Sequence, residues 1–170
     1  MERTLRLLPR QQIFFDLARH MPEVNTTSVG TYLLFSWVAR EVFAAQQAFY
    51  DRFELSEGKL VVLLLLRQAP HYRLTPSALA EAAEVTRGTM TGLLAGLERS
   101  GLVKRTEHPQ DGRMFSIELT KPALDLFEQM LPQRFEHIAE FMSSLTEEEQ
   151  HQLRALLEKM SRELPALSTS

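Results

Sequence analysis

The chain has no cysteine among its 170 residues. Disulfides, thiolate metal ligands, cysteine nucleophiles and thiol-based redox sensing are therefore excluded. Long apolar runs are also missing, because the longest one, residues 60–66, is far shorter than the roughly 20 residues that cross a bilayer. No apolar segment with a small-residue cleavage site follows the charged N-terminus. These absences predict a soluble, cytoplasmic protein.

A strong excess of one charge is absent too. The net charge is −3, with 44% hydrophobic and 24% charged residues, which is ordinary globular composition for one folding unit with an appended arm. The charge is uneven along the chain. Residues 86–116 carry five basic residues against three acidic ones, whereas residues 121–170 carry five against nine. Because screening limits exposed charges to about 8–10 Å, this local balance permits DNA binding without demanding it.

Enzyme and metal signatures are missing as well. The sequence has no Gly-x-Ser-x-Gly, no phosphate-binding glycine loop and no dinucleotide fingerprint. Its five histidines are scattered, without a His-x-x-x-His pair. Glu148 and His151 have the spacing of a di-iron ligand pair, but the second pair and the further carboxylates of such a site are lacking. We therefore expect no enzyme activity, no metal and no cofactor.

What the sequence does contain is a series of helix signals. A short amphipathic helix around Ile13 precedes a polar run, residues 25–28, that is expected to be a linker, and an apolar helix follows over 31–51. Ser56, Thr75 and Thr86 are typical N-caps, Pro76 suits a first helical position and Gly101 suits a left-handed C-cap. These signals predict three further helices, of which the one after Thr75 is short.

One β signal follows. Residues 102–106 and 114–119 flank a turn-rich tip that contains Asp111-Gly112, which is typical of a hairpin. Phe115, Ile117 and Leu119 alternate, so one face of the second strand should be buried. Thr120 is expected to cap a long helix that Pro132 kinks, and a last helix opens at a capping box of Thr146 with Glu149 and continues through Leu164.

Three helices, the last two close together, followed by a hairpin predict a mainly α fold with a small β-hairpin wing, a winged helix-turn-helix. A helix fits the DNA major groove, and polar residues in its first turns reach base edges. Gly88 and Gly92 each weaken the helix by roughly 1 kcal/mol relative to alanine, and close approach of a ligand backbone would explain them. The residues that would read DNA from this helix are Thr86, Arg87, Thr89, Met90 and Thr91.

Several short segments of the chain resemble a known family. Residues 74–80 (Leu-Thr-Pro-Ser-Ala-Leu-Ala), 98–103 (Glu-Arg-Ser-Gly-Leu-Val), 111–113 (Asp-Gly-Arg) and 119–120 (Leu-Thr) are similar to the signature of the MarR (multiple antibiotic resistance regulator) family. The resemblance runs from about Thr31 to Leu164, and the N-terminal extension with residues 131–133 is similar to the efflux-pump repressor subgroup.

The resemblance implies a homodimeric repressor that binds double-stranded DNA and releases it on binding a small, phenolic or lipophilic effector. Arg113 would insert from the wing tip into the minor groove, whose negative potential attracts guanidinium groups, and Asp111 would brace it. A local salt bridge that shapes the turn is the alternative role for these two residues. The candidate DNA contacts are Thr75, Thr86, Arg87, Thr89, Met90, Thr91, Arg105, Asp111 and Arg113.

Three segments follow from this interpretation: an N-terminal arm and dimerisation helix (1–52), the winged helix-turn-helix (53–120) and C-terminal dimerisation helices (121–170). Apolar stripes at both ends, which a monomer of this length would cover with difficulty, support a dimer independently of the family. A two-fold dimer requires a pseudo-palindromic DNA site. For the effector, Trp37 and Arg40 could supply a stacking surface and an anion partner, although a core aromatic and an ordinary salt bridge are the commoner roles.

A second function remains open, a winged-helix module that contacts protein and binds little or no DNA. The wing distinguishes the DNA-binding function from the protein-binding one. A module that only contacts protein needs no basic wing tip, whereas this chain has Arg113 at the tip in addition to Lys104 and Arg105.

Overall fold

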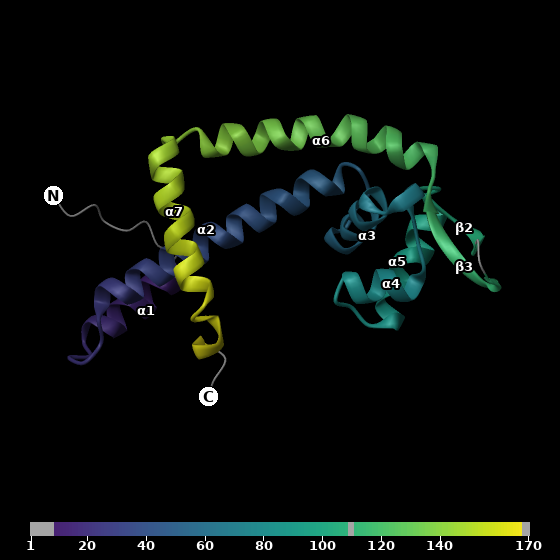
Figure 1. Cartoon of the computed structure of the whole chain (residues 1–170). Coiled ribbons are helices and arrows are strands. Elements are labelled where there is room, and N and C mark those ends of the chain that lie inside the picture. Colours follow the sequence, from purple (N-terminus) through teal and green to yellow (C-terminus); the bar gives the residue numbers. More distant parts are fainter. Residues whose placement is uncertain (1–8, 109–110, 168–170) are drawn as a thin grey trace. The chain divides into compact units, whose positions relative to one another are not determined.

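The computed structural model describes residues 9–108 and 111–167, with their side chains except those of 10, 107–108, 111–114 and 166. The chain divides into two compact units, Met1–Leu64 and Leu65–Ser170. Figure 1 follows the elements in chain order. Within the described residues, no helix has the length and apolar character that crossing a membrane requires.

The first unit is helical. It contains α1 (Pro9–Arg19), α2 (Thr26–Asp51) and the start of α3 (Glu57–Gln68). The prediction of a linker over 25–28 is wrong, because Asn25 caps α2 by accepting a hydrogen bond from the Ser28 N–H (3.1 Å). Short polar side chains favour such caps, so the polar run is the first turn of a longer helix.

The second unit holds the rest of the chain. In order, it contains η1 (Pro70–Tyr72), β1 (Arg73–Leu74), α4 (Pro76–Ala82), α5 (Arg87–Arg99), β2 (Val103–His108), β3 (Asp111–Leu119), α6 (Lys121–Met142), α7 (Glu147–Ser161) and η2 (Leu164–Leu167). The mainly α fold with a β-hairpin wing is confirmed. The last helix ends three residues before Leu164, which lies in η2 instead.

The sheet has a strand that the sequence did not reveal. β3 lies in the centre, between β2 and the two-residue strand β1, and both neighbours are antiparallel to it. Arg73 pairs with Glu118 and Leu74 with Ile117. A two-residue strand leaves no alternation in the sequence, so only the long-range pairing identifies it.

Local signals fix the ends of the helices as predicted. Thr75, Thr86, Thr120 and Thr146 each accept a hydrogen bond from a backbone N–H of the helix that they cap, and Thr146 completes a capping box with Glu149. Gly101 has φ of 68°, the left-handed geometry expected of it. The Thr120 hydroxyl also donates to the Gly101 carbonyl (2.7 Å), which ties the start of α6 to the end of α5.

The apolar side chains of the winged helix point inward. Side chains that are at most 5% exposed come from α3, α4, α5, β2, β3 and α6: Leu66, Leu79, Leu94, Leu97, Val103, Ile117, Leu119, Ala123 and Phe127. Ile117 and Leu119 are buried as their alternation predicts, while Phe115 remains 40% exposed. The core therefore holds α5 and the wing as a fixed pair of elements.

Candidate nucleic-acid interface

α4 and α5 form a helix-turn-helix in which both helices begin at a threonine cap. The Thr75 hydroxyl oxygen accepts from the Ala78 N–H (3.3 Å), and that of Thr86 accepts from the Thr89 N–H (3.1 Å). Glu84, in the turn between the helices, has φ of 52°. The two predicted contact residues Thr75 and Thr86 therefore already hold the helix starts in place.

The first turns of α5 present a polar surface. Arg87, Thr89 and Thr91 are exposed. The hydroxyls of Thr86 and Thr89 lie 2.9 Å apart, and the Thr91 hydroxyl donates to the Arg87 carbonyl (2.8 Å). The Arg87 guanidinium makes no hydrogen bond or ion pair with any side chain that the structure describes. It is therefore available to an external anion.

Gly88 and Gly92 lie on the same polar surface. A Cβ added at Gly92 would meet nothing within 4 Å, and one at Gly88 would meet only the Thr86 hydroxyl at 3.8 Å. Packing inside the chain therefore does not require glycine at these positions. Since interior glycines destabilise a helix, the two glycines indicate close approach by something outside the chain.

Met90 is buried beneath this surface, which argues against the DNA contact predicted for it. Its side chain is 1% exposed and belongs to the core with Leu94 and Leu97 of the same helix. A buried thioether cannot reach a base edge. The helical period of 3.6 residues turns position 90 inward, whereas 87 and 91 face outward.

An open groove of about 430 Å³ joins the two helix starts to the wing. Its lining comes from three elements: Thr75, Pro76 and Ser77 at α4, Arg87, Met90 and Thr91 at α5, and Phe115 on β3. The groove brings together four of the predicted contact residues, Thr75, Arg87, Thr91 and the buried Met90 at its wall.

Arg105 is engaged within the winged helix. Its Nε and Nη2 donate to the two carboxylate oxygens of Glu98 at 2.7 and 3.2 Å, and its guanidinium lies 4.7 Å from the centre of the Phe115 ring. Bidentate pairing and stacking on an aromatic ring are the strong interactions of arginine. These contacts join the end of α5 to both strands of the wing, so the structure favours a positioning role for Arg105.

A second charged cluster joins all three strands. The Glu118 carboxylate on β3 bonds to the Arg73 guanidinium on β1 and lies 3.1 Å from the Lys104 ammonium on β2. Burial raises the pKa of Glu118, but the hydrogen bonds and charges of Lys104 and Arg73 outweigh it, and the net pKa lies below the usual 4.5. Glu118 therefore stays ionised and holds the base of the wing together.

The wing-tip candidates belong to β3. Asp111 and Arg113 lie in the first three residues of this strand, and the Cα of Asp111 pairs with that of His108 after a register irregularity. Their side chains lie outside the described residues, so the contacts predicted for them stay predictions.

The predicted effector residues lie on α2. Trp37 is half-buried, and Arg40 is exposed with its guanidinium bonded to Glu41 (2.7 Å). No described hydrogen bond or ring contact joins Trp37 to Arg40.

Sequence reasoning missed three residues that shape this interface: Glu98, Phe115 as a stacking partner, and Glu118. The hairpin register offered one signal, because it places Glu118 opposite Lys104. No comparable signal pointed to Glu98, whose partner comes from another element. Among the described residues, no three His, Asp or Glu side chains gather as a metal site would require.

Comparison with known proteins connects this geometry to a family. Residues 55–115 match the model of the MarR family. The chain is 34% identical over 145 residues to the HTH-type transcriptional repressor YetL of Bacillus subtilis, covering 85% of this chain and 87% of YetL. It is 30% identical over 117 residues to the HTH-type transcriptional regulator PecS of Dickeya dadantii, covering 68% of this chain and 70% of PecS.

Solved structures agree in fold. The crystal structure of MepR, a transcription regulator of the Staphylococcus aureus multidrug efflux pump MepA, superposes with a TM-score of 0.65 at 29% identity and covers 77% of this chain and 96% of that one. A MepR variant bound to an oligodeoxyribonucleotide gives a TM-score of 0.56 at 29% identity, with 77% of this chain and 95% of that one covered.

Proposed function

This chain belongs to the MarR family, and from that membership we propose that it binds a pseudo-palindromic DNA operator as a homodimer and represses transcription. It is a DNA-binding transcriptional regulator and not an enzyme, in agreement with the expectation from its motifs.

The exposed face of α5 carries the proposal. Its first turns offer Arg87 without a described partner, two threonine hydroxyls and two glycines whose side of the helix is open. A helix with small and polar residues on its outer face fits the major groove, where Arg and Thr read or orient base edges. Arg87, Thr89 and Thr91 are the contacts that we propose from α5, and Thr75 and Thr86 place them.

The wing supplies the second contact. Arg113 inserts into the minor groove, where the negative potential is strongest when the groove is narrow, and Asp111 braces it. Arg105 holds the wing against α5 through its hydrogen bond to Glu98 and its contact with the Phe115 ring. Phosphate contacts made by the helix starts would set the register, and α5 and the wing tip would read the sequence.

Exposed apolar side chains on the terminal helices support the proposed homodimer. On α1 and α2, Phe14 is 58% and Phe43 62% exposed; on α6 and α7, Phe141 is 59% and Leu156 60% exposed. Apolar faces of this kind mark protein interfaces. We assign residues 1–52 and 121–170 to dimerisation and 53–120 to DNA binding.

Release by a small, phenolic or lipophilic effector completes the proposed cycle. Trp37 and Arg40 are the candidate effector residues on α2, and Arg40 would exchange Glu41 for an anionic group of the effector. The two proposed DNA-contacting elements belong to the second unit, so the effector would act by shifting the balance between conformations of the dimer.

The test is fluorescence anisotropy with an operator selected from fragments of the source genome, against a scrambled duplex, at two salt concentrations. Tight, selective and salt-sensitive binding is expected. Arg113→Ala should weaken binding to the operator by about 1–3 kcal/mol at unchanged dimer mass. Equally weak binding to both duplexes would contradict the proposal and favour a module that contacts protein.

A further inference from the structure

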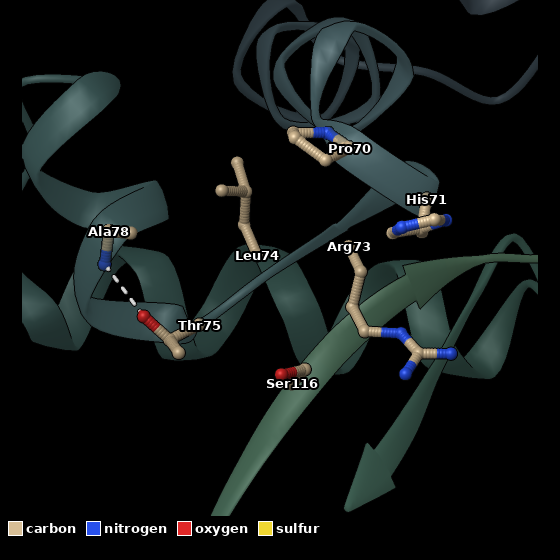
Figure 2. A pocket seen from close by; sticks show the side chains of 7 residues that line it. All are labelled: Pro70, His71, Arg73, Leu74, Thr75, Ala78 and Ser116. Atoms are coloured by element: carbon tan, nitrogen blue, oxygen red, sulfur yellow. Dashed lines mark hydrogen bonds between the residues drawn. The ribbon is translucent and has the colours of Figure 1, made fainter. Parts of the chain in front are cut away.

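The base of the wing contains an open pocket of about 520 Å³ that the proposed DNA contacts do not use (Figure 2). It is formed by η1, β1, the start of α4 and one residue of β3, and it shares only Thr75 with the groove that faces the helix starts. Its volume lies within the range of about 300–1,000 Å³ that is typical of small-molecule sites.

A serine that is almost fully buried lines this pocket with its hydroxyl. Ser116 is 2% exposed and is the one polar residue among the buried side chains that the structure describes. Its carbonyl accepts from the Thr106 hydroxyl (3.5 Å), but its own hydroxyl has no described partner. Figure 2 shows this hydroxyl projecting from β3 toward Thr75. Arg73 is the one described residue with a fully buried side-chain polar atom that lacks a partner, so the Ser116 hydroxyl is open to the pocket, where a ligand group can bond to it.

The charge around the pocket favours an anion. Arg73 lines the pocket, and together with Lys104 it faces the single carboxylate of Glu118, so the three groups sum to one positive charge. The Arg73 Nε is buried without a hydrogen-bond partner among the described residues. One small anion would therefore balance this corner of the sheet.

Three apolar side chains make up one part of the remaining wall, beside His71 and Thr75. Pro70, Leu74 and Ala78 line it, and the lining contains no Phe, Tyr or Trp. η1 contributes Pro70 and His71 to the lining, and His71 has φ of 55°. Pro70, Leu74 and Ala78 suit the body of an aliphatic ligand.

We propose that the wing-base pocket binds a small aliphatic monocarboxylate, with the Ser116 hydroxyl donating to the carboxylate, Arg73 supplying the positive field, and Pro70, Leu74 and Ala78 enclosing the apolar body. The ligand would contact Thr75, which caps α4, and Ser116 on β3, and both elements position the proposed DNA contacts. Binding is measured without DNA, so the proposal stands or fails separately from the operator contacts.

The experiment is calorimetric titration of the full chain with cyclohexanecarboxylate and with pivalate. Cyclohexanecarboxamide, which has the same body without the charge, should bind at least tenfold more weakly, because hydrogen bonds to charged groups are the stronger ones. Ser116→Ala should weaken binding of the carboxylate about tenfold or more and leave the melting temperature unchanged, since no described hydrogen bond of the hydroxyl is lost.

Two further variants locate the site. Ser77→Ala makes the same chemical change on α4 outside this pocket and should leave binding unchanged. Ala78→Leu fills the pocket from α4 without touching a charge and should abolish binding. The proposal would be overturned if neither carboxylate showed saturable binding, or if the carboxylate and the amide bound equally well. It would also be overturned if Ser77→Ala lost binding while Ser116→Ala bound the carboxylate like the wild type.

Discussion

The winged helix and the terminal helices differ in how much of their apolar surface one chain covers. In the winged helix, Leu79, Leu97 and Ile117 are completely buried. On α7 no residue is buried, and Leu153, Leu156, Leu157 and Met160 are all at least 38% exposed. A stable helix normally hides its apolar stripe, so the contrast supports our proposal that a second chain covers the terminal helices, whereas the winged helix buries its own apolar side chains.

The largest expected effect tests whether a second chain covers the terminal helices. Leu156→Glu places a charge on the exposed stripe of α7 and should dissociate the dimer, because a buried unpaired charge is expensive. Operator binding should fall by about 10² to 10⁴, the usual loss when two linked contacts become independent. Sedimentation and anisotropy measure the two effects.

Gln152→Glu is the matched control, since it adds the same charge to an exposed polar position one turn earlier. It should remain dimeric. A monomeric Leu156→Glu chain that binds the operator as tightly as the wild type would contradict the role given to the terminal helices.

The next effect distinguishes the role of Arg87, a proposed DNA contact, from that of Arg105, which positions the wing. Arg87→Ala should weaken binding about tenfold, because a hydrogen bond to phosphate is charge-assisted, and should lower the salt slope by about 1 if it contacts phosphate alone. A selective loss for one operator base would instead make Arg87 a base reader.

The double variant Glu98→Gln with Arg105→Gln keeps the net charge and removes the bond between α5 and the wing. It should weaken binding with the salt slope unchanged. A slope lower by about 1 would show that Arg105 contacts phosphate and would refute its positioning role.

A smaller effect concerns two glycines with equally open surroundings. Gly92→Ala should raise the free energy of unfolding by about 1 kcal/mol, because alanine favours a helix and the added methyl group meets nothing within 4 Å. It should weaken DNA binding, because the methyl group would stand between α5 and the DNA in the proposed complex. Gly101→Ala should lower the free energy of unfolding by about 1–2 kcal/mol, because φ of 68° disfavours alanine. Chemical denaturation measures both, and a Gly92→Ala protein with normal operator affinity would disprove close approach at this position.

The smallest effect is pH-dependent. Since the pKa of Glu118 is lower in the folded chain than the usual 4.5, its contribution to stability is complete above that value and is lost as the pH falls through the lowered pKa. Urea unfolding between pH 6 and pH 3 should show a shallower loss in Glu118→Gln than in the wild type. Glu128→Gln, at an exposed position of α6, should follow the wild type.

Local chemistry made much of the fold predictable. The threonine caps, Pro76 and Gly101 act within a few residues, so their patterns identify the helix ends, and the alternation of Ile117 and Leu119 identifies the buried face of β3. β1 escaped because two residues carry no pattern and are held by pairing with a strand more than 40 positions later.

The candidate site was less predictable, because its contacts join residues that are distant in the sequence and leave no local pattern. Thr89 and Thr91 were placed correctly on the outer face of α5, but Met90 between them is buried. The role of Arg105 depends on Glu98 and Phe115, which come from other elements. Helical position could be predicted from the sequence, whereas partners across elements required the tertiary structure.

The most direct test of the account is the mass of the full chain in solution and on its operator, measured by sedimentation. We predict a species of twice 19.5 kDa that binds one duplex as a unit and whose DNA affinity falls when α7 is disrupted. A chain of 19.5 kDa that binds the same duplex tightly as a monomer would contradict the central claim that the terminal helices are completed by a second copy.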